Sequence, residues 1–320
     1  MKINWQLLLD DDSRFPRTVY FEEPSTYRFR YGINSDLKCC LYVHLPPEKN
    51  KEPIVPILME NISLEEMSKD GNNTLVLTLL NENARSLFSD FIANIVSEAK
   101  HYSDEKLKKG FIDLCYNWFE LFDPVSSLLS KSEIQGLFGE LTFLKYLLEN
   151  STLDSNTILS GWKGPYGKGH DFELDNNHFE VKGLSTGKSI VNISSEYQLD
   201  YLSGQTVILL IYELHLTEHI GNSIFDVVND IVSILRAKSQ GPSIKKLWTA
   251  LRKVGITNYN IIEFNSFRFT IKDQIQFNCS NTQFPSIKRS TIPDEIKNVN
   301  YELSINTLSN FRIEDLRLFL

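Results

Sequence analysis

Residues 167–183 read GKGHDFELDNNHFEVKG, a stretch that predicts a β-hairpin. Two short segments of alternating polarity flank an Asp-Asn-Asn turn, a common way to join antiparallel strands. Side chains two positions apart on a strand face the same side, so Glu180 and Lys182 project together while Val181 points into the core. Closing the hairpin brings Asp171 of the first segment beside Glu180 and Lys182. The stretch therefore predicts two carboxylates and an ammonium on one patch.

This set of groups has the composition of a site for metal-assisted hydrolysis of a phosphodiester bond. Mg²⁺ is usually held by one or two carboxylates, with water and substrate phosphate completing its coordination. Asp171 and Glu180 are the candidate ligands, helped by the carbonyl of Val181, and Mn²⁺ is the expected substitute ion. Lys182 is the candidate for positioning the attacking water or for stabilising charge that develops on the phosphate.

The order of these residues, Asp171 followed after a short hairpin by the EVK triplet at 180–182, resembles the PD-(D/E)XK superfamily of restriction-endonuclease-like nucleases. His170 stands where the name of the superfamily has a Pro, a departure that many members share. The resemblance covers about residues 133–214 and implies an α/β, or α+β, fold with a mixed sheet flanked by helices. Elsewhere the layout is similar to poorly characterised bacterial members encoded beside restriction-modification genes.

The resemblance also points to polar residues on two neighbouring segments. A helix predicted over residues 131–150 carries Glu140, and members of the superfamily commonly place a Glu on the helix before the hairpin. Binding a second metal, orienting a water and making a structural hydrogen bond are all open roles for Glu140. Some exonuclease-like members carry a Gln and a Tyr on a helix after the hairpin. Gln198 is therefore a candidate for supporting the site or contacting substrate, against the alternative of a solvent-facing side chain, and Tyr201 is expected in the core.

Acidic-x-Lys triplets also arise by chance in a chain with 41 acidic residues. Four others begin at Asp36, Glu98, Asp104 and Glu295. The triplet at Glu295 follows Pro293-Asp294 and so imitates the name of the superfamily, but an adjacent Asp and Glu would face opposite sides of a strand. Its surroundings indicate a polar connection. Only the EVK triplet combines a paired strand, a turn and a preceding acidic helix.

Two histidines lie beside the predicted acidic residues. Strand geometry turns His170 away from the face of its neighbour Asp171, which favours a structural role. His178 shares a face with Glu180 and Lys182, and lining the edge of the hairpin is the alternative to a part in the chemistry.

The composition predicts a substantial core and no membrane span. Apolar residues make up 42% of the 320 positions, and no apolar run reaches 18 residues. The N-terminus lacks the features of a secretory signal peptide. The four cysteines have no zinc-ligand spacing, so we expect a reduced, cytoplasmic protein.

The net charge of −8 bears on how the protein would meet DNA. Affinity for DNA comes largely from Lys and Arg side chains that neutralise phosphates. Lys163, Lys168 and Lys188 surround the predicted site, and the basic residues of 238–253 form either a DNA track or a solvated helix face. The charge indicates modest intrinsic affinity, or a partner protein that brings the DNA.

Patterning divides the chain into four predicted regions. Residues 1–95 are expected to be a β-rich module for recognition or interaction, and 96–130 a helical connector. The nuclease core is expected over 131–258, followed by a β-rich extension over 259–320. Strands are predicted at 18–22, 27–32, 37–45, 54–60, 73–80, 171–174, 179–183, 189–193, 206–214 (central in its sheet), 261–271, 274–278 and 301–305. Helices are predicted at 83–99, 104–122, 131–150, 222–238 and 243–253.

These features together predict a Mg²⁺-dependent DNA endonuclease of bacterial restriction or antiphage defence. The alternative is a non-catalytic or partner-activated interaction subunit of a defence complex, because a fold alone does not establish activity. An RNase or a structure-specific nuclease would use the same metal site. The expected partners are DNA, a second copy of the chain, and restriction or defence proteins.

Overall fold

The chain divides into two compact units in the computed structural model. Unit 1 is Met1–Val125 with Thr257–Tyr259, and unit 2 is Ser126–Ile256 with Asn260–Leu320. The residues that the structure describes are 3–10, 14–47, 54–69, 71–123, 129–167, 169–238 and 241–320. No helix within these ranges combines the length and the apolar character needed to cross a membrane.

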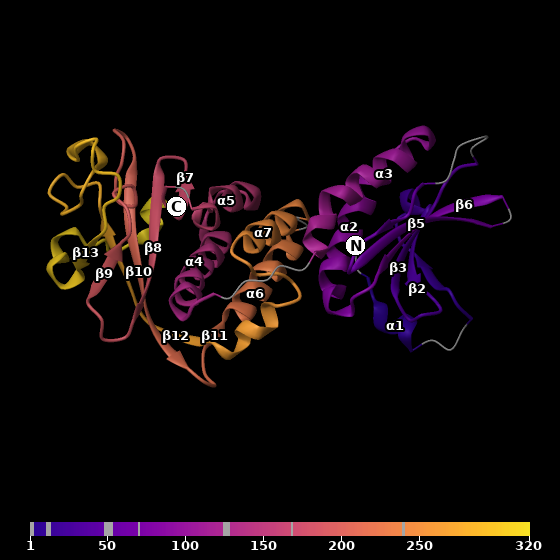
Figure 1. The fold of residues 1–320 in the computed structure, drawn as a ribbon, viewed down its shortest axis with the longest axis horizontal. Coiled ribbons are helices and arrows are strands. Elements are labelled where there is room, and N and C mark those ends of the chain that lie inside the picture. The colour runs from indigo at the N-terminus through magenta and orange to yellow at the C-terminus, as the bar shows by residue number, and fades with distance from the viewer. Residues whose placement is uncertain are drawn as a thin grey trace. The chain divides into compact units, whose positions relative to one another are not determined.

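Unit 1 contains a six-stranded antiparallel sheet, as expected for a β-rich N-terminal region (Figure 1). The strand order is β1-β2-β3-β6-β5-β4. The strands are β1 (Arg17–Tyr20), β2 (Phe29–Ile33), β3 (Cys39–His44), β4 (Ile57–Leu58), β5 (Ile62–Lys69) and β6 (Asn72–Leu79). The sequence prediction missed β5, whose Leu-Glu-Glu-Met stretch favours a helix by local propensity. Pairing with β6 along all eight residues overrides that preference.

The helices of unit 1 bury an aromatic face. These helices are α1 (Trp5–Leu9), α2 (Arg85–Ala99) and α3 (Asp104–Phe119), with short 3₁₀ turns at Glu82–Ala84 and Glu120–Phe122. Phe91 stacks on Trp118 with ring centroids 5.4 Å apart, and Phe88 and Phe122 meet edge to face. The aromatic residues at helical spacing, Phe88, Phe91, Phe111 and Trp118, therefore belong to the core, whereas Tyr116 is exposed.

Unit 2 is built on a five-stranded mixed sheet with the order β11-β12-β10-β8-β7. Its strands are β7 (Phe172–Leu174), β8 (Asn177–Ser185), β10 (Thr206–Thr217), β11 (Asn222–Ser223) and β12 (Arg268–Asn278). β8 runs parallel to β10, and the other neighbours are antiparallel. β10 is central, as its continuous apolar run predicts. This mixed sheet with flanking helices is the predicted fold class.

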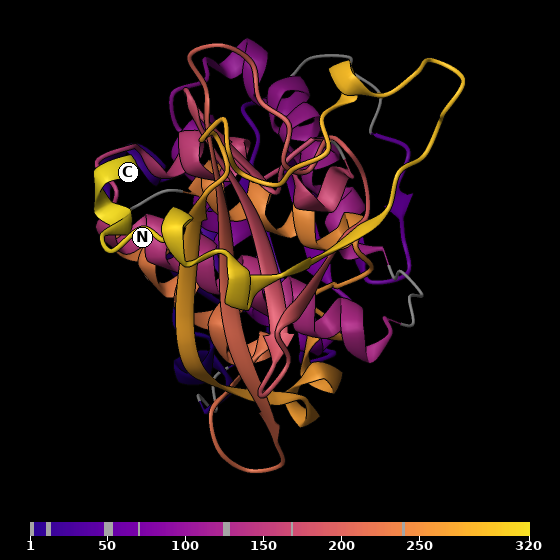
Figure 2. The same cartoon turned by 90° about the vertical axis from the view of Figure 1, so that its left-hand side faces the viewer.

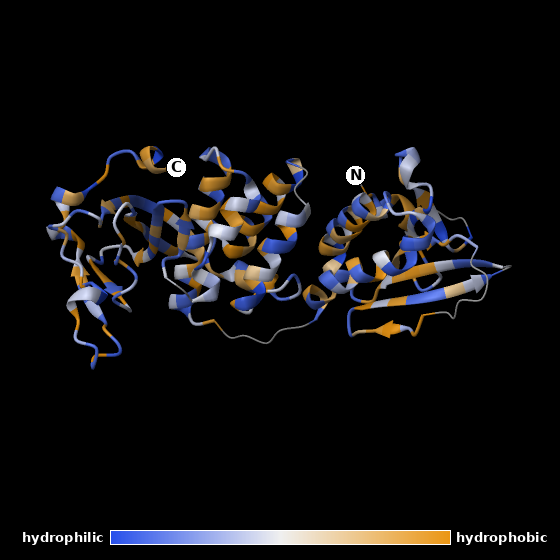
Figure 3. Ribbon diagram, turned by 90° about the horizontal axis from the view of Figure 1, so that it is seen from above, coloured by the Kyte–Doolittle hydropathy of each residue, from blue (hydrophilic) through white to orange (hydrophobic). Residues whose placement is uncertain are grey.

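The two faces of this sheet are covered differently. Figure 1 shows the helices of unit 2 on one side and the antiparallel pair β9 (Ile190–Ile193) and β13 (Tyr301–Ser304) on the other. Figure 2 shows the C-terminal segment crossing that second face in front of the long strands. The helices are α4 (Lys131–Asn150), α5 (Ser155–Gly161), α6 (Ile224–Ala237) and α7 (Gly241–Lys253). Figure 3 shows hydrophobic and hydrophilic residues alternating along the helices, so each has an apolar face for the core.

Helix α4 carries Glu140 and packs closely against β8, the strand with Glu180 and Lys182. Ser130 and Glu133 form a capping box at its N-terminus, each side chain bonding to the backbone N–H of the other. A Cβ on Gly183 of β8 would lie only 2.7 Å from the carbonyl oxygen of Gln135. Glycine therefore lets β8 approach the helix closely.

Two expected elements of unit 2 are wrong. Residues 261–266 form a 3₁₀ segment, Ile261–Ser266, and only then does the chain enter β12, which joins the two strands predicted at 261–271 and 274–278. The segment around Gln198 and Tyr201 forms turns between β9 and β10 in place of the expected helix. Local composition alone does not separate these turns from a short helix, because both are polar and rich in hydrogen-bonding side chains.

Candidate active site

The hairpin predicted from residues 167–183 is present. β7 and β8 pair antiparallel with Phe172 opposite Phe179, and Asp175 in the connection has a positive φ of 52°. Asp171 directly precedes β7, and Glu180 and Lys182 lie on β8. Phe172 and Phe179 both pack on Phe143 of α4, so the side chains of the opposite strand face point away from the helices.

Glu180 is a buried carboxylate, and one of its two oxygens makes no ion pair or hydrogen bond within the described residues. The residue is 1% exposed, and the Nζ atom of Lys182 lies 2.8 Å from Oε1. The other oxygen, Oε2, has no hydrogen-bond partner among the described residues. Burial, and to a smaller extent the nearby carboxylate of Asp171, raise the pKa of the Glu180 carboxyl to about 8. The Lys182 ammonium lowers this pKa but does not offset the two effects. An oxygen in this state is free to accept a cation or a proton.

Asp171 is fixed at the edge of β8. Its Oδ2 accepts a hydrogen bond of 2.8 Å from the backbone N–H of Val181. The N–H and C=O of one strand residue point to the same side, so the Val181 carbonyl faces the side of Asp171 as well. Burial raises the pKa of the Asp171 carboxyl, while the Val181 N–H and the Lys182 charge oppose the shift.

The third predicted carboxylate, Glu140, holds the loop before the hairpin. Its Oε2 accepts a 2.7 Å hydrogen bond from the indole N–H of Trp162. The residue is partly exposed, yet desolvation of the carboxyl raises the pKa of Glu140 well above its usual value, and Asp171 adds to the shift. A structural hydrogen bond is thus one role of Glu140.

Because Gly164 has no side chain, the carboxylates of Glu140 and Asp171 can both lie close to its Cα atom. A Cβ on Gly164 would overlap Oε2 of Glu140 and would lie 3.2 Å from Oδ1 of Asp171. The backbone N–H groups of Lys163 and Gly164 both donate to the Asp171 carbonyl, at 2.7 and 3.1 Å. The glycine-rich connector therefore packs against the acidic site. Lys168, predicted beside the site, lies outside the described residues.

Gln198 contacts Lys182 from a turn. Its Oε1 accepts from Lys182 Nζ at 3.3 Å and from the backbone N–H of Ser194 at 2.8 Å. The Lys182 ammonium is thereby held between Glu180 and Gln198. Tyr201 is partly buried against the apolar cluster between the sheet and the β9–β13 pair, and Lys288 lies over its ring at 3.7 Å.

The two histidines, together with Glu173, form a second polar cluster on the hairpin. His170 and His178 are both buried, with their Nδ1 atoms 3.1 Å apart. The Nε2 atom of His170 donates to the Asp200 carbonyl at 3.0 Å. Burial lowers the pKa of His170. The prediction that His170 faces away from the acidic side of the hairpin is wrong, because residue 170 lies in a bend before β7, where strand alternation does not apply, and its ring meets that of His178.

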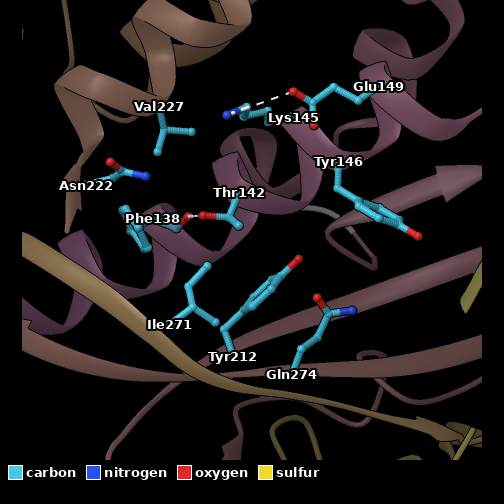
Figure 4. Close-up of a pocket in the computed structure, with 10 residues that line it drawn as sticks. All are labelled: Phe138, Thr142, Lys145, Tyr146, Glu149, Tyr212, Asn222, Val227, Ile271 and Gln274. Atoms are coloured by element: carbon cyan, nitrogen blue, oxygen red, sulfur yellow. Dashed lines mark hydrogen bonds and ion pairs between the residues drawn. The ribbon is translucent and has the colours of Figure 1, made fainter. Parts of the chain in front are cut away.

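The decoy triplet at Glu295 lies in an exposed turn without a strand, as its polar surroundings indicate. The pocket in Figure 4 is also separate from the acidic residues. It has a volume of about 240 Å³ and lies between α4 and the strands β10 and β12, with Phe138, Tyr146, Tyr212 and Gln274 among its lining residues. Asp171, Glu180 and Lys182 do not line it.

Comparison with known proteins gives a single result. The family model described as "Putative PD-(D/E)XK family member, (DUF4420)" matches residues 2–306. No curated protein and no solved structure matches the chain.

Proposed function

The chain belongs to this PD-(D/E)XK-like family, and we propose that it is a Mg²⁺-dependent DNA endonuclease. The observation that carries the proposal is the pairing on β8 of a buried carboxylate, Glu180, with an ammonium, Lys182, beside Asp171. Burial of charged groups is costly, and a buried carboxyl whose pKa is raised by desolvation beside a second carboxylate is characteristic of sites that bind a ligand or catalyse a reaction.

The residues of this site suit a divalent cation. Oε2 of Glu180 is buried without a partner among the described residues, and Asp171 and the Val181 carbonyl face the same edge of β8. These oxygen ligands match the preference of Mg²⁺, with Mn²⁺ as a substitute. When bound, such an ion lowers the pKa of water and polarises the scissile phosphate.

The chain's own residues have distinct parts in this proposal. The Val181 N–H fixes the orientation of the Asp171 carboxylate. Lys182 orients the attacking water or stabilises charge on the phosphate, and Gln198 and Glu180 hold its ammonium in place. Glu140 acts through Trp162 and Gly164, and positions the loop that packs against Asp171.

A role in bacterial restriction or antiphage defence, with help from a partner, extends the proposal. The net charge of −8 supports dependence on a second copy of the chain or on other defence proteins, because DNA affinity rests mainly on basic side chains. The β-rich region of residues 1–95 is the proposed recognition or interaction module.

The proposal is tested with purified protein on methylated and unmethylated plasmid and on RNA, with Mg²⁺, Mn²⁺ or chelator. We expect metal-dependent cleavage of DNA. Asp171→Ala, Glu180→Ala and Lys182→Ala should each lower the rate by at least about 10²-fold with an unchanged circular dichroism spectrum. Glu295→Ala and Lys297→Ala, from the decoy triplet, are the matched controls and should cleave normally.

Several outcomes would count against the proposal. Full activity of Lys182→Ala, or loss of activity in Glu295→Ala, would mean that the wrong triplet was chosen. Absence of nicking with every metal, substrate and candidate partner would favour the non-catalytic interaction subunit.

A further inference from the structure

His170, Glu173 and His178 form a second group with metal-ligand chemistry, on the same hairpin as the acidic site. One ligand atom from each residue lies within 4.8 Å of the others, and within the described part of the chain no other set of three His, Cys, Asp or Glu residues meets this condition. We propose that these three residues bind a Zn²⁺ ion that fastens the hairpin, separately from the cation of the acidic site.

The distance between the two imidazoles fits a shared ion. The Nδ1 atoms of His170 and His178 are 3.1 Å apart, and the rings meet at 63° with centroids 4.9 Å apart. Zinc–nitrogen bonds of about 2.0–2.1 Å with tetrahedral angles place two ligand nitrogens about 3.3 Å apart. A small shift of the rings therefore accommodates one ion between them.

A hydrogen bond sets the tautomer of His170 for metal binding. A carbonyl oxygen can only accept, so Nε2 of His170 carries the proton that it donates to Asp200. In the neutral ring, the lone pair of Nδ1 then accepts a hydrogen bond from Nδ1 of His178. A metal ion would take the place of that hydrogen once His178 adopts the tautomer with its proton on Nε2. Metal-binding histidines characteristically donate their second ring nitrogen to a carbonyl or carboxylate in this way.

Glu173 completes the set from the neighbouring strand. It lies directly opposite His178 in the β7–β8 register, so both side chains share one face. Gly169, with a φ of 61°, passes close to the carboxylate: a Cβ there would lie 2.6 Å from Oε1 of Glu173. Two imidazoles and one carboxylate leave a fourth tetrahedral position for water.

The ligand types select the ion. Mg²⁺ and Ca²⁺ prefer oxygen ligands, whereas imidazole nitrogen suits zinc and neighbouring transition metals. The same hairpin would thus carry an oxygen-rich site at Asp171 and Glu180 and a nitrogen-rich site two residues away on β8. Zn²⁺ at the second site would join β7, β8 and, through His170, the Asp200 segment. This role does not depend on nuclease activity.

The test measures zinc and cobalt directly. Full-length protein is stripped with chelator, reloaded with Zn²⁺ and dialysed, and its metal content is determined by mass spectrometry. Affinity follows from competition with a chromophoric chelator, and Co²⁺ loading is monitored by visible absorption. We expect one Zn²⁺ per chain and the intense absorption bands of four-coordinate Co²⁺.

Variants assign the ion to these ligands. His170→Ala, His178→Gln and Glu173→Gln should each weaken Zn²⁺ binding by at least about tenfold. Glu180→Ala, in the acidic site, and His219→Ala, an exposed histidine, are the controls and should bind Zn²⁺ as the wild type does. Wild-type protein without bound zinc and without the cobalt bands would overturn the inference, whatever the folding of the variants. Undiminished binding in His178→Gln, or loss of zinc in Glu180→Ala, would overturn it as well.

Discussion

Glu180 is the residue at which burial and charge compete most directly. Its pKa of about 8 lies above the ordinary value of 4.5, so the metal-free carboxyl holds a proton at neutral pH more often than an exposed glutamate does. Desolvation disfavours the anion more than the Lys182 ammonium favours it. A cation that binds Glu180 must therefore displace a proton.

This competition predicts pH-dependent binding of Mg²⁺. The folded-state pKa is raised, so the metal-binding anion becomes more populated as pH rises from 6 toward the pKa of about 8. Affinity should tighten up to about tenfold per pH unit below that value and level off above it. Titration calorimetry in two buffers of different ionisation enthalpy should show the proton release. Affinity that is constant from pH 6 to pH 9 would contradict this assignment.

A second prediction at this scale concerns Gly164. The added methyl of Gly164→Ala would overlap Oε2 of Glu140 and crowd Asp171, so it should displace the carboxylates and lower the cleavage rate at least about tenfold. Gly139→Ala is the matched control. Its Cβ would make ordinary contacts of 3.5 Å with Val181 and 3.6 Å with Tyr212. Steady-state cleavage rates of the two variants should therefore differ. Equal rates would mean that the space at Gly164 does not affect the acidic site.

At the scale of elements, α4 and β8 form the support for the acidic residues. The helix begins at a capping box and packs closely on Gly183 of the strand. Because Glu140 of the helix holds the loop that packs against Asp171, while the backbone N–H of Val181 on the strand holds the Asp171 carboxylate, the distance between the two elements affects the position of Asp171.

Substitution at Gly183 tests this support. Gly183→Ala places a methyl 2.7 Å from the Gln135 carbonyl, so it should destabilise the fold by about 1–3 kcal/mol. Gly136→Ala, in α4 with open space around the new methyl, should instead be neutral or stabilising by up to about 1 kcal/mol. Urea unfolding of both variants gives the comparison. A Gly183→Ala variant as stable as the wild type would mean that the helix and the strand can separate freely.

At the scale of the whole molecule, the charge limits how tightly the protein alone can hold DNA. The chain has 33 basic and 41 acidic residues. We expect the isolated protein to bind a generic duplex with a Kd of about 1 μM or weaker at physiological salt, and to lose affinity steeply as salt rises. Fluorescence polarisation with a labelled duplex and Glu180→Gln, in the presence of Mg²⁺, measures this. Nanomolar binding without a partner would refute partner dependence.

Elements with a strong local pattern could be predicted from the amino-acid sequence alone. The apolar period of 3.6 predicted α4 over Lys131–Asn150, the bounds found in the structure. The continuous apolar run predicted the central strand β10. Alternation on the hairpin assigned Glu180 and Lys182 to one strand face, where they pair. These features depend on residues close in the chain, so they can be read without knowing the packing.

Contacts between side chains far apart in the chain became known from the packing of the elements. Glu140 bonds to Trp162, 22 positions away, and His170 bonds to Asp200, 30 positions away. Gln198 reaches Lys182 from a turn, where the family resemblance had implied a helix. The strand β5 forms because β6 pairs with it, against its own propensity. Periodicity specifies which face of an element is buried, but contacts between elements determine what that face touches, and the acidic and histidine clusters both depend on such contacts.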